Sequence, residues 1–124
     1  MTTEQRGGKT MILQTKYAFC AIFTSDGFDY PQPDNEISIR FPDIPGAISC
    51  GDNFTDGVNM AQDCLAIMLI DSLENNLPIP EPTSPDAIKL AVNETLHLIQ
   101  IDLRDYYPEE ITKLEMNDGE PVNA

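Results

Sequence analysis

The chain has 124 residues, of which 41% are hydrophobic, and this is enough for one modest core but not for two. Seven Lys and Arg residues stand against 21 Asp and Glu residues, which gives a formal charge of −14. Such a charge excludes tight binding to phosphate backbones and favours basic partners, although it can also serve solubility alone.

The first predicted element is a strand over residues 16–24. Apolar side chains occupy both of its faces, since Tyr17, Phe19, Ala21 and Phe23 alternate with Ala18, Cys20 and Ile22. This pattern indicates a strand in the interior of a sheet. The preceding residues lack apolar periodicity, and we expect residues 1–14 to form a disordered leader outside the fold.

Two further strands follow a turn and a stretch rich in proline and acidic residues. Residues 36–41 alternate between apolar and polar side chains, and residues 47–50 form a short third strand. The segment between them, PDIPG at 42–46, has two prolines that favour extended backbone and a glycine that permits unusual angles. We expect a stiff turn there, with Ile44 packed back on the core.

The helix that follows has the clearest signals. Asn53 is a good N-cap, and Asp56 lies three residues later, where its carboxylate can accept a hydrogen bond from the N–H of the cap. The helix should end near Asn75. One apolar stripe contains Phe54, Val58, Ala61, Leu65 and Met68, while Met60, Cys64 and Ile67 make it wider than one packing surface needs.

The last part of the chain begins with a proline-rich, extended connector, LPIPEPTSP. A weak helical turn at 86–92 precedes a fourth strand at 97–103, and residues 105–124 form a short acidic tail in which Ile111 and Leu114 would anchor a short helix. The order strand, strand, strand, helix, strand predicts an α+β fold, with a small antiparallel or mixed sheet and one main helix.

The sequence offers no catalytic constellation. Its acidic residues lie mostly in turns, whereas acid–base or metal chemistry needs carboxylates that converge from rigid elements. The single histidine, His97, has no neighbouring nucleophile and is expected to be an ordinary strand residue. Cys50 lacks a cationic neighbour and is expected to be a buried small hydrophobe. We therefore expect no enzyme, no metal and no cofactor.

The compartment is indicated by the cysteines and by the lack of long apolar runs. Cys20, Cys50 and Cys64 show none of the close spacing of zinc or redox motifs, which is typical of free thiols in a reducing environment. The longest apolar run, residues 64–70, is far shorter than the roughly 20 residues that span a bilayer. We expect a cytoplasmic protein without membrane contact.

Several motifs occur in a characteristic order. They are Pro-Asp-Ile-Pro-Gly at 42–46, Gly-Asp at 51–52 before the helix cap, and the proline-rich LPIPEPTS, flanked by the strands YAFCAIF and LIQIDL. With these motifs, residues 15–104 resemble the HicB antitoxin family of type II toxin–antitoxin systems. The resemblance implies a partial ribonuclease-H-like domain of order β-β-β-α-β. Ribonuclease H relatives keep a metal-binding acid in their first strand, and residues 16–23 contain none.

The resemblance further implies an antitoxin that binds and neutralises a small basic HicA-type toxin, a ribonuclease that cleaves mRNA. The charge of −14 suits such a partner, because opposite charge accelerates encounter. We expect the contact surface on the sheet and its turns, where acidic residues are concentrated: Asp26, Asp29, Asp34, Glu36 and Asp43.

Two further interactions can be predicted. The wide apolar arc around Met60, Cys64 and Ile67 favours a homo-oligomer. Family members often carry a C-terminal DNA-binding module, but residues 104–124 are too few for one and contain only Arg104 and Lys113 as basic residues, so DNA binding is doubtful. Two other interpretations stay open, a solitary HicB-like binding or scaffold domain without a toxin, and an unrecognised hydrolase.

Overall fold

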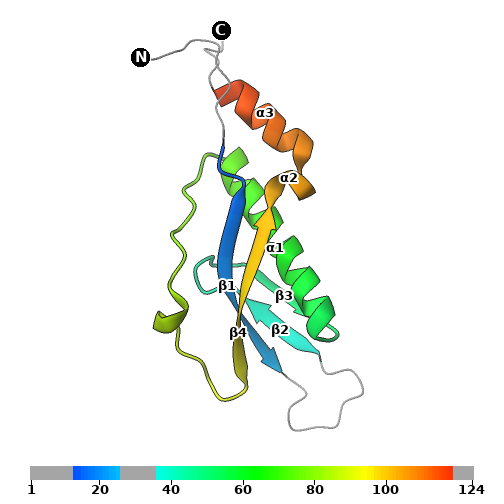
Figure 1. Ribbon diagram of the computed structural model, residues 1–124, viewed down its shortest axis with the longest axis vertical. Helices are drawn as coiled ribbons and strands as arrows, with labels where there is room; N and C mark the ends of the chain where they lie inside the picture. Colours follow the sequence, from blue (N-terminus) through cyan, green and yellow to red (C-terminus); the bar gives the residue numbers. More distant parts are fainter. Residues whose placement is uncertain (1–12, 26–35, 119–124) are drawn as a thin grey trace.

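The computed structural model describes residues 13–25 and 36–118 (Figure 1). A four-stranded sheet in the order β3-β2-β1-β4 packs against one long helix, α1 (Phe54–Glu74). The strands are β1 (Lys16–Ser25), β2 (Ile37–Arg40), β3 (Ile48–Gly51) and β4 (Glu94–Asp102). All three strand pairings are antiparallel. The predicted α+β class and the order β-β-β-α-β are confirmed.

β1 is an interior strand, as its two apolar faces predict. It pairs with β2 through Phe23 opposite Ile39 and with β4 through Phe19 opposite Ile99. The odd-numbered residues of β1 face the main core, and Cys20 on the opposite face is also almost fully buried.

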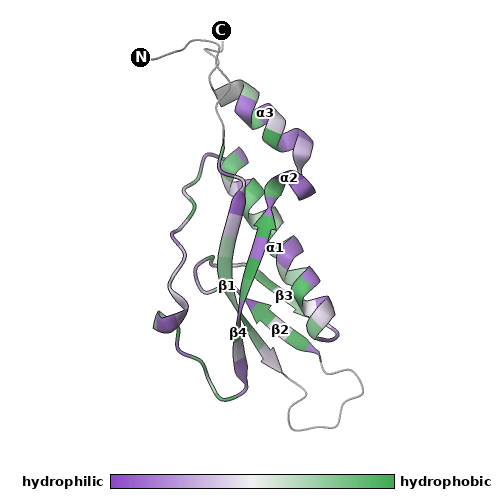
Figure 2. Ribbon diagram, viewed as in Figure 1, coloured by the Kyte–Doolittle hydropathy of each residue, from purple (hydrophilic) through white to green (hydrophobic). Residues whose placement is uncertain are grey.

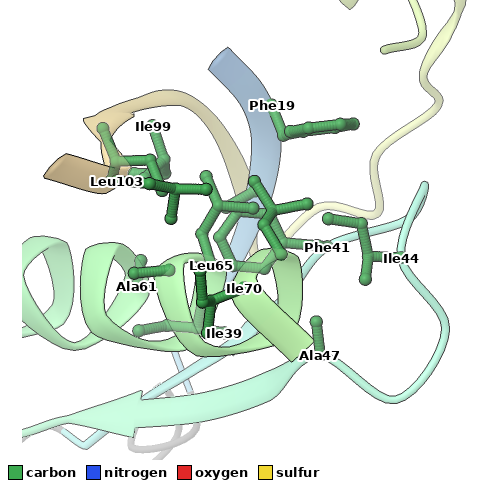
Figure 3. Close-up of a cluster of buried hydrophobic side chains, with 14 of the residues drawn as sticks. Phe19, Ile39, Phe41, Ile44, Ala47, Ala61, Leu65, Ile70, Ile99 and Leu103 are labelled. Atoms are coloured by element: carbon green, nitrogen blue, oxygen red, sulfur yellow. The ribbon is translucent and has the colours of Figure 1, made fainter. Parts of the chain in front are cut away.

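The core lies between the sheet and α1. Figure 3 shows side chains from the strands, from α1 and from the turn at 42–46 converging on one cluster, and Figure 2 shows hydrophobic residues in all four strands and in α1. Ile44 belongs to this cluster, so the predicted return of the turn onto the core is confirmed. Gly46 has a φ of +88°, in the left-handed region that favours glycine.

α1 begins after Asn53, whose side-chain oxygen accepts a hydrogen bond from the N–H of Asp56 at 2.8 Å. The Asp56 carboxylate does not bond to the N–H of the cap as predicted; it accepts from the N–H of Asp52 at 2.9 Å. Asp52 follows the last paired residue of β3, so its N–H has no partner in the strand ladder. The helix ends at Glu74 with Asn75 as its C-cap, and Asn76 adopts a left-handed φ of 58°.

Three sequence expectations need correction. β4 begins at Glu94 rather than at 97, because the ladder with β1 extends through the polar pair Thr24 and Glu94. The weak helical turn is only a 3-10 turn, Pro85–Ala87. Cys50 is exposed rather than buried, since it pairs with Ser38 on the face of β2 opposite to the buried Ile39.

Two helices follow β4, α2 (Leu103–Tyr106) and α3 (Pro108–Asp118) (Figure 1). Ile111 on α3 is fully buried in the main core, and Glu115 forms an ion pair with Arg104 and accepts a hydrogen bond from the N–H of Leu13. The predicted short helix is thus present. The predicted leader lies outside the described residues except for its last two, and the domain limits of 15 and 104 stay a prediction.

Within the described ranges, no helix is both long and apolar enough to cross a membrane. The same ranges contain no group of three or more His, Cys, Asp or Glu side chains arranged to hold a metal ion.

Candidate partner-binding surfaces

An acidic end of the molecule lies where β2 begins and where β3 leads into α1. Glu36, Asp52 and Asp56 gather there around the Cys50 thiol. Partial desolvation, followed by the negative charge of Glu36 and then those of Asp52 and Asp56, raises the pKa of Cys50. A thiol of this kind stays protonated near neutral pH, so Cys50 lacks the thiolate that a nucleophile needs. We call these three carboxylates the acidic end.

Two glycines hold this end together. A Cβ placed on Gly51 would lie 2.5 Å from the Cα of Gly57, so the end of β3 and the first turn of α1 are in direct backbone contact. Gly57 in turn lies over the ring of Phe23 in β1. This close approach fixes the short segment between the two glycines, which carries Asp52, Asn53 and Phe54.

Within the described sheet, the positive charge nearest to the acidic end is already paired with a carboxylate. Arg40 on β2 forms a 3.1 Å ion pair with Glu94, which also accepts a hydrogen bond from the N–H of Ala91 at 2.8 Å. The bond from Ala91, and then that from Arg40, hold the pKa of Glu94 below its ordinary value. Glu94 therefore stays ionised, and Arg40 leaves little positive charge to weaken the field of the acidic end.

An aromatic hollow of about 400 Å³ adjoins the acidic end. Three rings meet there: the centroid of His97 lies 4.5 Å from that of Phe23 and 5.0 Å from that of Phe54. Phe54 was expected in the core, but as the first residue of α1 it is 52% exposed. The lining residues are Phe23, Ser25, Ile37, Asp52, Asn53, Phe54, Asn93 and Thr95.

His97 is a strand residue, as predicted, and its ring packs against those of Phe23 and Phe54. Its Nε2 lies 2.8 Å from the hydroxyl of Thr95. Burial lowers the pKa of His97, so the ring is neutral at physiological pH.

Asp43 lies elsewhere, beyond the opposite end of β2 from Glu36. Its carboxylate accepts two hydrogen bonds from Thr83 in the connector, from the N–H at 2.8 Å and from the hydroxyl at 2.5 Å. Both oxygens are therefore engaged within the chain. The bonds tie the PDIPG turn to the proline-rich connector, 40 residues away in sequence.

An apolar patch lies over α1 and the edge strand β3. Met60, Cys64 and Ile67, which the sequence predicts as an oligomer interface, line one hollow of about 360 Å³ together with Ile48. Ile48 is 72% exposed and Ile67 is 56% exposed. The other lining residues are Ser49, Asp63, Tyr106 and Tyr107. We call Ile48, Met60, Cys64 and Ile67 the apolar patch.

The structure thus separates the residues predicted for toxin binding. Glu36 is exposed at the acidic end, Asp43 is bonded to Thr83, and Asp26, Asp29 and Asp34 lie outside the described residues. The residues predicted from the sequence for toxin binding did not include Asp52 or Phe54. Gly-Asp immediately before an N-cap is the signal that could have found them, because it places both side chains beside a helix start.

Comparison with known proteins identifies the family. The family model described as HicB-like antitoxin of bacterial toxin–antitoxin system matches residues 28–98, which is more than half of the chain. No curated protein gives a significant sequence match.

Two solved structures have a similar fold. A chain from "Toxin-Antitoxin complex from Streptococcus pneumoniae" is 18% identical with a TM-score of 0.64, covering 73% of this chain and 72% of that one. A chain from "HicA3 and HicB3 toxin-antitoxin complex" is 21% identical with a TM-score of 0.53, covering 69% of this chain and 99% of that one. The family match, on a fold shared with these structures, shows that the chain belongs to the HicB-like antitoxin family of bacterial toxin–antitoxin systems.

Proposed function

We propose that the protein is an antitoxin that binds a small basic HicA-type ribonuclease and neutralises it. The family match carries this proposal, and the two similar folds belong to chains of toxin–antitoxin complexes. The charge of −14 supports a basic partner, because a strongly acidic surface steers such a partner and disfavours RNA.

The proposed contact surface is the acidic end. Glu36 and Asp52 are exposed there, and the predicted contacts Asp26 and Asp29 lie in the sequence between β1 and Glu36. Asp43 is a weaker candidate, because both of its oxygens are already bonded to Thr83. We therefore expect Asp43 to support the turn rather than to meet the toxin directly.

The experiment is a kinetic binding measurement between this chain and the small basic protein encoded beside it. Neutralising Asp26, Asp29 and Glu36 together should slow association and flatten its dependence on salt, while dissociation changes little. The matched control neutralises Asp105, Glu109 and Glu110, which follow the C-terminal end of β4, away from Glu36. If the control slows association equally, only the net charge acts and the acidic end is not the contact surface.

The alternative is a solitary HicB-like binding or scaffold domain without a toxin. The experiment favours this alternative if the wild-type chain and the neighbouring basic protein neither co-purify nor bind each other.

We also propose that copies of the chain associate through the apolar patch. An edge strand beside exposed apolar side chains is a surface that a second copy can cover, and Cys64 and Ile48 already approach each other across it, with the Cys64 sulfur 3.9 Å from the Ile48 carbonyl oxygen. Sedimentation should show an oligomer that Ile67→Glu dissociates. Val92→Glu is the control, since Val92 is 96% exposed before β4 and does not line the hollow of the patch. A monomeric wild-type chain at micromolar concentration contradicts this proposal.

A further inference from the structure

The aromatic hollow beside the acidic end has walls of two different kinds. One wall contains the rings of Phe54 and Phe23, and the ring of His97 packs against both of them, with all three centroids within 5.8 Å of each other. The other consists of short polar side chains, including the exposed carboxylate of Asp52. A ligand in the hollow would therefore meet ring faces and a negative charge together.

The charges around the hollow exclude an anion. None of the described residues that line it is basic, and Asp56 and Glu36 add negative charge beside Asp52. The N-terminus of α1 would ordinarily attract an anion, but the N–H of Asp56 in its first turn is already bonded, and the carboxylate of Asp56 adds negative charge there. Asn53 accepts from the N–H of Asp56, and Asp56 places its own carboxylate over the N–H of Asp52.

The Asp52 carboxylate itself is available. Its backbone N–H is bonded to Asp56, but within the described part of the chain no hydrogen bond or ion pair engages its side chain. Glu94, by contrast, holds Arg40 and the N–H of Ala91. Asp52 can thus accept a hydrogen bond from a ligand without breaking a contact of the fold.

We infer that this hollow receives an arginine or lysine side chain of the basic protein that the chain binds. This inference rests on the proposed function and adds to it the anchoring contact. A cation over the Phe54 ring gains the attraction of the aromatic face, and the Asp52 carboxylate completes its hydrogen bonding. Arginine suits the hollow best, because its planar guanidinium stacks on rings and donates to a carboxylate at the same time.

The inference makes the ring of Phe54 the determinant, rather than its bulk. Phe54→Tyr keeps the aromatic face and should bind the neighbouring basic protein as tightly as the wild-type chain. Phe54→Leu keeps an apolar side chain but removes the ring, and it should weaken binding about tenfold. Asp52→Asn should weaken binding by a similar factor and reduce its dependence on salt.

The controls are matched by exposure and by charge. Leu98 on β4 is 53% exposed, nearly the same fraction as Phe54, and Leu98→Ala tests the loss of an exposed apolar side chain elsewhere. Asp105 on α2 is exposed, and Asp105→Asn tests the loss of one charge. Both controls should bind like the wild-type chain. Circular dichroism confirms that each variant is folded before titration calorimetry measures its affinity.

The outcomes separate the two proposals. If the wild-type chain does not bind the neighbouring protein, the proposed function is wrong and this inference falls with it. If the wild-type chain binds, but Phe54→Leu binds as tightly as Leu98→Ala, the proposed antitoxin function is unaffected and the proposed contact of a cation with the Phe54 ring is refuted. Equal losses for Phe54→Tyr and Phe54→Leu also refute it, because the aromatic face would then not be the determinant.

Discussion

The two hydrogen bonds between Thr83 and the Asp43 carboxylate should hold the proline-rich connector against the PDIPG turn. A hydrogen bond to an ionised acceptor contributes about 1.5–3 kcal/mol when it is buried. Because this pair is only partly buried, we expect Asp43→Ala to lower the free energy of unfolding by about 2 kcal/mol for both bonds together. That is a sizeable share of the roughly 5–15 kcal/mol typical of a small domain.

A double-mutant cycle isolates the contact. Thr83→Val removes the hydroxyl bond but keeps the N–H bond, so it should cost about 1 kcal/mol alone and less than that in the Asp43→Ala background. Urea denaturation gives the four free energies, and hydrogen exchange should show a protected Thr83 amide that loses its protection in Asp43→Ala. Asp86→Ala is the control, an exposed acid immediately after the connector.

The reasoning about the connector would be refuted by two findings together. These are an unprotected Thr83 amide in the wild-type chain, and a coupling energy that cannot be distinguished from zero.

Three further predictions concern packing, pH and DNA. Gly51→Ala should lower the free energy of unfolding by about 2–3 kcal/mol, because the added Cβ would overlap backbone atoms of Gly57. Gly46→Ala should cost only about 1 kcal/mol, because there is open space around Gly46 and only its left-handed φ opposes the change. Equal costs in chemical denaturation would contradict the close approach of Gly51 to Gly57. The pKa of Glu94 is lowered in the folded chain, so its ionised carboxylate stabilises the fold above the ordinary pKa of about 4.3, and this stabilisation is lost as the pH falls through the folded pKa. The difference in free energy of unfolding between the wild-type chain and Glu94→Gln should therefore shrink on acidification. A difference that does not change with pH would count against the ion pair with Arg40. Duplex DNA should bind weakly at most in fluorescence anisotropy, because Arg104 is already paired with Glu115, and tight, salt-sensitive binding by the isolated chain would overturn this expectation.

Much of the fold follows from local patterns in the sequence. The two apolar faces of residues 16–24 predicted an interior strand, and β1 does lie between β2 and β4. Asn53 was recognisable as a cap because capping depends on residues within one turn. These signals are short-range, so a single sequence contains them.

The errors occurred where the outcome depends on distant parts of the chain. A strand of four residues such as β3 has too few alternations to show which face is covered, and Cys50 consequently looked buried. Phe54 fits the apolar stripe of α1, but at the first position of the helix it is about half exposed. The partner of Asp43 is 40 residues away, and no local pattern indicates Thr83.

The proposed role as an antitoxin is tested most directly by the growth of cells that express the neighbouring basic protein, with and without this chain. The proposal predicts that the basic protein alone arrests growth, that the chain restores it, and that the two proteins then co-elute as a complex. Continued arrest in the presence of the folded chain, with no complex on purification, would contradict it.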